Sequence, residues 1–164
     1  MEKFVVSLGT RIAFLVTLAT ALFFRGESYA QSDVNDVKAA VDAYHVALSA
    51  LNMSKMEPLW AHDDYVMLVN PQDQNVSIGW DTVKKDWEMQ FSALADLKVT
   101  QADGPHIYVK GDVAWSTGIA SAVIKLKSGM SATAPTFETD VFEKRGSAWL
   151  LVSHTALSVS RPMP

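Results

Sequence analysis

The sequence predicts a single α+β domain in which three helices of the N-terminal half pack on a curved, mostly antiparallel sheet. Two stretches, beginning near residues 32 and 79, repeat apolar residues with helical spacing. The C-terminal half is instead rich in strand-forming residues that are interrupted by short turns. Helices followed by a run of strands are typical of an α+β arrangement, and 164 residues are enough for one domain.

The composition excludes several function classes. The formal net charge is −4, which argues against a nucleic-acid-binding protein with a basic face. The chain has no cysteine, so disulfides, thiolate catalysis and cysteine-bound metal sites are ruled out. No two histidines have the H-x-H or H-x-x-x-H spacing of a metal site, so we expect no metal. We also expect no cofactor.

Residues 1–30 differ from the rest of the chain. Lys3 and Arg11 precede an uncharged run, Ile12–Phe24, which is shorter than the roughly 20 residues of a bilayer-spanning helix. Small residues follow at Ser28 and Ala30, and the whole pattern predicts a secretory signal that is cleaved after Ala30. The mature domain would then be residues 31–164, secreted or located in a bacterial periplasm. An uncleaved N-terminal membrane anchor is the alternative.

Apolar residues spaced alternately by three and four predict the first helix, with Ser32 or Asp33 as its N-cap. Ser54 and Glu57 have the spacing of a capping box, which predicts a short second helix ending near Trp60. A third helix is expected to start at Gly79. The apolar positions are Val34, Val37, Val41, Tyr44, Leu48 and Leu51 in the first helix, and Trp80, Val83, Trp87, Phe91 and Leu94 in the third.

Strand-forming residues predict the sheet. Asp64–Asn70 is the first predicted strand, and residues 71–75 form a turn. In the longest predicted strand, Val113–Lys127, Gly118 is expected to mark a bulge that bends the strand. Residues 128–132 are predicted to form a loop. The remaining predicted strands are Leu97–Gln101, Ile107–Lys110, Thr136–Lys144 and Trp149–Ser160.

Several short motifs occur in a distinctive order along the predicted domain. They are Tyr44 in the first helix, Leu59–Asp64 before a strand, Asn70-Pro71, Gly79–Asp81 opening a helix, and Phe142–His154. Together they resemble the nuclear transport factor 2-like superfamily, in particular its SnoaL-like and ketosteroid-isomerase-like branches. The resemblance implies a cone-shaped fold that encloses a pocket between helices and sheet, and a homodimer formed through the sheet. It implies no single activity, because this fold hosts both enzymes and binding domains.

The resemblance to the isomerase branch also implies site residues. In that branch, a tyrosine and a protonated carboxylic acid donate hydrogen bonds to an enolate while a carboxylate moves the proton. Tyr44 and Asp140 match the two donors, whereas Asn70 occupies the place of the base, directly before Pro71. Since a carboxamide cannot accept a proton at neutral pH, the match does not extend to the base.

The residues by themselves leave alternatives open at both matched donors. Tyr44 lies on the apolar stripe of the first helix, which also fits a core tyrosine with a satisfied hydroxyl group. Asp140 shares strand parity with Glu138 and Lys144, which favours a solvated face, and also with Phe142, which favours the interior. The sequence therefore does not decide whether Asp140 faces a pocket.

A polar cluster and a histidine of the last predicted strand are further candidates, the first for acid-base chemistry and the second for the pocket lining. His62 and Asp63 lie in the densest polar cluster of the sequence, where a histidine beside carboxylates fits a general base. Ordinary polarity of a helix-to-strand connection is the alternative. His154 lies in the last predicted strand and is expected either to face the pocket or to be a satisfied core histidine.

We predict a pocket for a small apolar carbonyl compound and consider two function classes. In the first, the domain isomerises, cyclises or hydrolyses the ligand, with Tyr44, Asp140 and either His62 or Asp63 as catalytic groups. In the second, it is a non-enzymatic periplasmic module that binds a ligand or a protein. The candidate lining residues are Trp60, Asn70, Trp87, Trp115 and His154.

Overall fold

The structure, a computed structural model, describes residues 31–159, so the predicted secretory signal (residues 1–30) lies outside the described residues. Residues 31–49 are helical, followed by α2 (Met53–Met56), the 3-10 helix η1 (Glu57–Leu59) and α3 (Trp80–Ala93). The strands are β1 (Met67–Val69), β2 (Ser77–Ile78), β3 (Leu94–Lys110), β4 (Val113–Leu126), β5 (Ser131–Arg145) and β6 (Ala148–Ser158).

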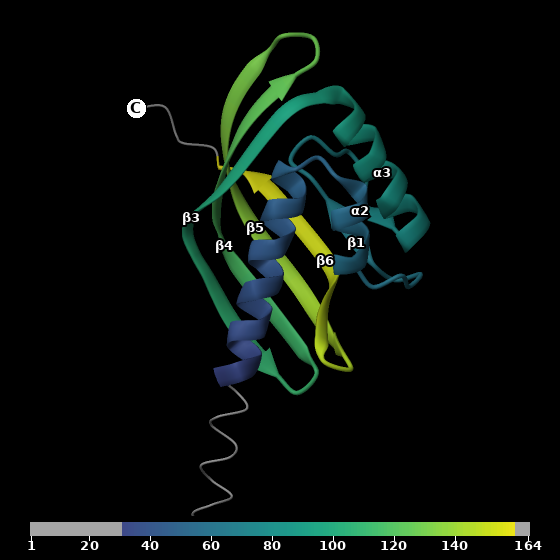
Figure 1. Ribbon diagram of the computed structural model, residues 1–164, viewed down its shortest axis with the longest axis vertical. Coiled ribbons are helices and arrows are strands. Elements are labelled where there is room, and N and C mark those ends of the chain that lie inside the picture. Colours follow the sequence, from purple (N-terminus) through teal and green to yellow (C-terminus); the bar gives the residue numbers. More distant parts are fainter. Residues whose placement is uncertain (1–30, 160–164) are drawn as a thin grey trace, which may run out of the picture. The chain divides into compact units, whose positions relative to one another are not determined.

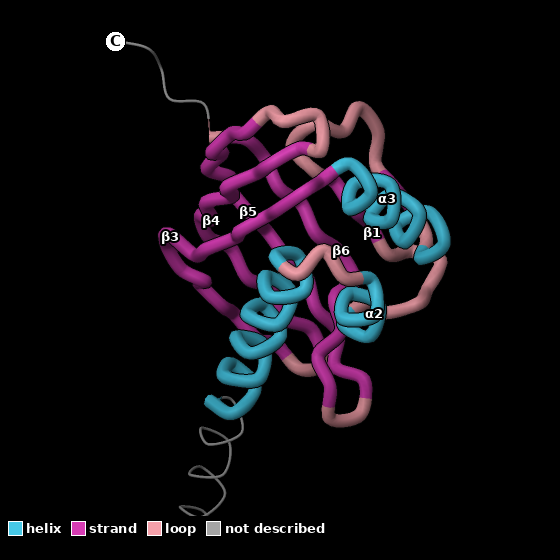
Figure 2. The backbone as a smooth tube through the Cα atoms, turned by 45° about the horizontal axis from the view of Figure 1, so that its top comes forward, coloured by secondary structure: helices cyan, strands magenta, loops and turns pink. Residues whose placement is uncertain are grey.

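The strands form one mixed sheet of six strands in the order β2-β1-β6-β5-β4-β3. Strands β3 to β6 pair antiparallel in chain order, whereas the short β1 runs parallel to β6. Figures 1 and 2 show the helices on one face of the curved sheet. The predicted cone-shaped α+β fold is therefore confirmed. Among the described residues, no helix is long and apolar enough to span a bilayer.

The core lies between this face of the sheet and the helices. The apolar stripe predicted for the first helix is buried there, since Val37, Val41 and Tyr44 are at most 2% exposed. In the third helix, the predicted stripe is buried at Trp80, Val83, Trp87 and Phe91, whereas Leu94 belongs to the start of β3 and is partly buried. Large side chains that complete the core are Met56, Trp60, Leu68, Phe142, Trp149 and Leu151. Helical periodicity in the sequence thus identified the buried faces of both helices.

The helix starts differ from the predictions. Ser32 and Asp33 are already helical, so neither is the N-cap. In α2 the N-cap is Asn52 rather than Ser54, because Asn52 has an extended backbone and its side-chain oxygen accepts the Lys55 N–H at 3.3 Å. The predicted second helix is also divided into α2 and η1.

The two short strands predicted at Leu97–Gln101 and Ile107–Lys110 are parts of one long strand, β3, with register shifts near Asp103. Gly118 does mark an irregularity of the sheet, but on its β3 side: the register shifts between Asp103 and His106 opposite Gly118, whereas the pairing of Gly118 with β5 is regular. A Cβ atom at Gly118 would lie 2.6 Å from the Asp103 carbonyl oxygen. The glycine therefore provides space for irregular backbone on the neighbouring strand. The predicted loop 128–132 is shorter than expected, since β5 begins at Ser131.

Candidate functional site

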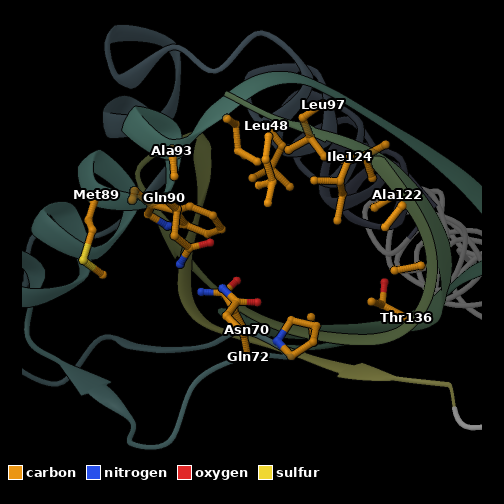
Figure 3. A pocket seen from close by; sticks show the side chains of 18 of the residues that line it. Leu48, Asn70, Gln72, Met89, Gln90, Ala93, Leu97, Ala122, Ile124 and Thr136 are labelled. Atoms are coloured by element: carbon orange, nitrogen blue, oxygen red, sulfur yellow. The ribbon is translucent and has the colours of Figure 1, made fainter. Parts of the chain in front are cut away.

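A cavity of about 630 Å³ lies between the helices and the sheet. Figure 3 shows Asn70 and Gln90 on one side of it and Ala122 and Thr136 on the other. Most of the lining side chains are apolar, which suits a small apolar ligand. The apolar lining residues are Leu48, Pro71, Trp87, Met89, Ala93, Leu94, Leu97, Val99, Ala122, Ile124, Leu126, Met130, Ala132, Ala134 and Ala156.

Strand β5 determines where the polar end of the cavity lies. Its inward positions alternate along the strand, and Ala132, Ala134, Thr136 and Glu138 line the cavity in that order. His154 on β6 lines the cavity beside Glu138. The small alanines thus leave room for an apolar ligand along β5. The two ionisable side chains, Glu138 and His154, lie together at the end of this row of lining residues.

His154 and Asp140 form a buried ion pair on adjacent strands. They are register partners on β6 and β5, and His154 Nδ1 donates a hydrogen bond of 2.6 Å to Asp140 Oδ1. Ser116 Oγ on β4 donates to the other carboxylate oxygen at 3.1 Å. All three residues are 2% exposed. The second ring nitrogen of His154, Nε2, has no hydrogen-bond partner among residues 31–159, so it is free for a ligand.

The surroundings of His154 favour its charged form. Burial by itself would lower the pKa of the imidazole, but the hydrogen bond and charge of Asp140, together with the charge of Glu138, raise the pKa above 6.5. The phenol ring of Tyr44 also packs on the imidazole ring of His154, and the two ring centroids are 4.9 Å apart. The arrangement stabilises an imidazolium whose Nε2–H can be given to a ligand.

Glu138 forms a second buried pair, with His45 of the first helix. His45 Nε2 donates a hydrogen bond of 2.8 Å to Glu138 Oε2, and both residues are 7% exposed. Thr136 Oγ1 lies 3.4 Å from the other carboxylate oxygen. Glu138 lines the cavity, whereas His45 is not one of the lining residues. A carboxylate held in this way faces the cavity in a fixed orientation.

Tyr44 lies behind the cavity wall. Its ring packs against His154 and Trp87, and its hydroxyl group is buried without a hydrogen-bond partner among the described residues. Burial raises the pKa of the Tyr44 hydroxyl, and the charges of Asp140 and Glu138 raise it further, so the phenol stays neutral. Asp140 also lies behind the wall, where His154 and Ser116 occupy its oxygens. Neither residue is one of the cavity-lining residues.

The five residues proposed for the pocket lining occupy three different places. Asn70, Trp87 and His154 line the cavity. Trp60 is 1% exposed in the core, and Trp115 lies on the outer face of the sheet, where its ring is tilted against the ring of Tyr108. Asn70 also closes the turn after β1, because its backbone and side-chain N–H groups both donate to Asp73 Oδ2.

His62 and Asp63 lie outside the cavity. The His62 ring stacks on Trp80 with centroids 4.3 Å apart, and its Nε2 donates to the Glu57 carbonyl oxygen at 3.0 Å. Asp63 forms an ion pair of 2.9 Å with Arg145 in a partly exposed network. These contacts fit the alternative of a polar connection between helix and strand. Within residues 31–159, no group of three or more His, Asp or Glu side chains is arranged to hold a metal ion.

The sequence reasoning missed the pair of Glu138 and His45. Glu138 seemed to indicate a solvated face, but Thr136, Glu138, Asp140 and Phe142 all point to the interior. The parity shared with Phe142 was the available signal. His45 follows Tyr44 in the first helix, at a position next to the predicted stripe, and nothing in the sequence brings it to β5.

Comparisons with known proteins agree with this architecture. One similar structure is a nuclear transport factor 2-like superfamily protein from Salmonella enterica, with a TM-score of 0.74 and 14% identity over 80% of this chain and 95% of that chain. Another is a candidate dehydratase of the same family from Streptomyces avermitilis, with a TM-score of 0.72 and 22% identity over 80% of this chain and 99% of that chain.

A third similar structure is a ketosteroid isomerase-like protein from Erwinia carotovora, with a TM-score of 0.67 and 16% identity over 79% of this chain and 98% of that chain. At these identities, the structures establish the fold alone. No curated protein matches the chain. The sequence profile of the SnoaL-like domain matches residues 37–162, which include all the strands that the structure describes and the lining of the cavity. The chain therefore belongs to the SnoaL-like domain family.

Proposed function

We propose that this domain catalyses proton transfer on a small, mainly apolar compound that carries an oxygen function. The observation that carries the proposal is the imidazole of His154 in the wall of an apolar cavity, with Nδ1 fixed on Asp140 at 2.6 Å and Nε2 free. A carboxylate behind a histidine fixes its tautomer and orientation, as acid-base catalysis requires. Such proton transfer needs no cofactor.

The reaction class is an isomerisation or an elimination beside a carbonyl group. The apolar lining favours a ligand with a hydrophobic body, and the polar end of the cavity suits its oxygen atom. Similar structures include the candidate dehydratase and the ketosteroid isomerase-like protein, and both names are compatible with this chemistry. Tyr44 and Asp140 keep a role in this proposal, but through His154 rather than through direct contact with the ligand.

The test uses two probe ketones and one substitution. The aldol adduct of benzaldehyde and acetone reports elimination, the β,γ-unsaturated isomer of cyclohexenone reports isomerisation, and both products absorb as conjugated enones. We expect wild-type protein to convert at least one of them and His154→Gln to lower kcat/KM by roughly 100- to 10,000-fold. The control is His106→Gln, because His106 is exposed on β3 and should leave the rate unchanged.

The competing function is a binding module without catalysis. Asn70, in place of the expected base, is the observation that favours it. If wild-type protein binds both ketones without converting either, the domain is a binding module and the catalytic proposal is wrong.

We also propose that the domain is a homodimer that associates through the outer face of its sheet. Tyr108, Trp115 and Phe137 are between 41% and 55% exposed there, and Tyr108 pairs with Trp115 across strands. An exposed apolar patch of this kind favours an interface between proteins. We expect Trp115→Glu to convert a dimer into a monomer in analytical ultracentrifugation. A wild-type monomer would contradict the proposal.

Export of the domain is a proposal that rests on residues 1–30 alone. A positively charged start, an apolar run and small residues before Gln31 support a cleaved signal. Mass spectrometry of the protein from the periplasm should give a chain that starts at Gln31, whereas a chain retained in the membrane would favour an anchor.

A further inference from the structure

The cavity wall contains two histidine–carboxylate pairs with opposite orientation. In one, the imidazole of His154 faces the cavity and the carboxylate of Asp140 lies behind it. In the other, the carboxylate of Glu138 faces the cavity and the imidazole of His45 lies behind it. The wall thus presents an acid and a base of opposite charge side by side, each held by a buried partner.

The sheet register places these two residues near each other on one face of the sheet. Asp140 is the direct partner of His154, and Glu138 is the partner of Ala156, so Glu138 and His154 are diagonal neighbours on one face. Such neighbours lie roughly 7–8 Å apart in an antiparallel sheet, and their Cβ atoms are somewhat closer than that. That separation allows the two side chains to reach adjacent atoms of a single ligand from the same side.

We infer that Glu138 is a second catalytic group and that the substrate is a β-hydroxy carbonyl compound, from which water is eliminated. This inference rests on the proposed function and deepens it. Glu138 removes the proton from the carbon beside the carbonyl, and the electron pair of that C–H bond forms the C=C bond. The C–O bond breaks with its electron pair on oxygen, and the oxygen takes the proton of His154 Nε2 and leaves as water.

The step balances without a cofactor or a change in oxidation state. It leaves a neutral His154 and a protonated Glu138, and transfer of that proton back to Nε2 restores the starting state. His45 is a positioning residue, because it touches Glu138 and does not line the cavity. Since both groups belong to the same wall, the proton and the hydroxyl group leave from the same side of the substrate.

The first experiment measures kcat and KM for the aldol adduct of benzaldehyde and acetone. We expect Glu138→Gln to lower kcat by roughly 100- to 10,000-fold with little change in KM, and Glu138→Asp to recover part of the rate. Glu143→Gln is the matched control, because Glu143 lies on the same strand in a partly exposed network with Tyr65 and Arg145. Fluorescence of bound N-phenylnaphthylamine, a neutral apolar probe, reports whether each variant keeps its cavity.

The second experiment tests the positioning role and the stereochemistry. His45→Phe should lower kcat, whereas His45→Gln, which keeps an N–H donor, should recover part of it. The stereochemical test uses an adduct that carries one deuterium on the carbon beside the carbonyl. The diastereomer in which deuterium and hydroxyl lie on the same side of the extended carbon chain should lose the label. Loss of the label from the other diastereomer contradicts the shared-wall mechanism.

The outcomes separate this inference from the proposed function. Activity that depends on His154 but survives Glu138→Gln overturns the role of Glu138 and leaves the proposed function standing. Conversion of the cyclohexenone isomer alone overturns elimination in favour of isomerisation. If wild-type protein converts neither ketone, both proposals fail.

Discussion

Replacing Asp140 with alanine is expected to lower the free energy of unfolding by about 3–5 kcal/mol. Removing one member of a buried ion pair leaves the other charge without a partner, which is strongly destabilising. Asp140 and His154 are both 2% exposed, and they are held together by a hydrogen bond of 2.6 Å. Ser116 loses its hydrogen-bond acceptor at the same time. Urea unfolding followed by circular dichroism measures the change, and Asp96→Ala, an exposed position on β3, is the control.

The double variant Asp140→Ala/His154→Gln tests the cause of this loss. Because the double variant removes both charges, its loss of unfolding free energy should be smaller than the sum of the losses in the two single variants. Losses that simply add would mean that the pair is not coupled.

The same pair predicts how stability depends on pH. The folded state raises the pKa of His154 above its unfolded value of 6.5, so protonation of this residue stabilises the fold. The contribution is fully present below pH 6.5 and is lost as the pH rises through the raised pKa. As the pH rises through this range, the free energy of unfolding should therefore fall more in wild-type protein than in His154→Gln. A difference between the two proteins that does not change with pH would contradict a charged His154 in the folded state.

Replacing Ala134 with tryptophan is expected to weaken binding of N-phenylnaphthylamine by more than about 100-fold, which corresponds to about 2.7 kcal/mol. Ala134 lines the cavity on β5 and pairs in register with Ala122 on β4, which lines it too. An indole group at this position occupies the space beside these small residues. Titration of probe fluorescence measures the affinity.

Thr133→Trp is the matched control for this substitution. Thr133 precedes Ala134 on the same strand, is exposed and points to the other face of the sheet. A tryptophan at this position therefore adds the same bulk outside the cavity. The affinity of this variant for the probe should stay near that of wild-type protein. Equal loss in both variants would show that the strand, rather than the cavity, determines binding.

Much of the fold could be predicted because its elements are encoded locally. The stripe from Val37 to Leu48 has the period of a helix, and its burial followed directly from that spacing. Errors arose where neighbouring strands decide the local conformation. The polar stretch between Gln101 and Ile107 looked like a break, but pairing with β4 keeps it within one strand. The N-cap of α2 is Asn52 rather than the predicted Ser54, because the helix already begins at Met53.

The helix stripes, the α+β class and the family resemblance could be read from the amino-acid sequence, because they depend on periodicity and motif order. Which polar residues meet became visible only in the folded chain. Asp140 and His154 are 14 residues apart, and His45 and Glu138 are 93 apart, so no local pattern connects either pair. Sheet register and helix packing bring them together around one cavity. The physical reason is that side-chain partners across strands are fixed by register, which a single sequence does not reveal.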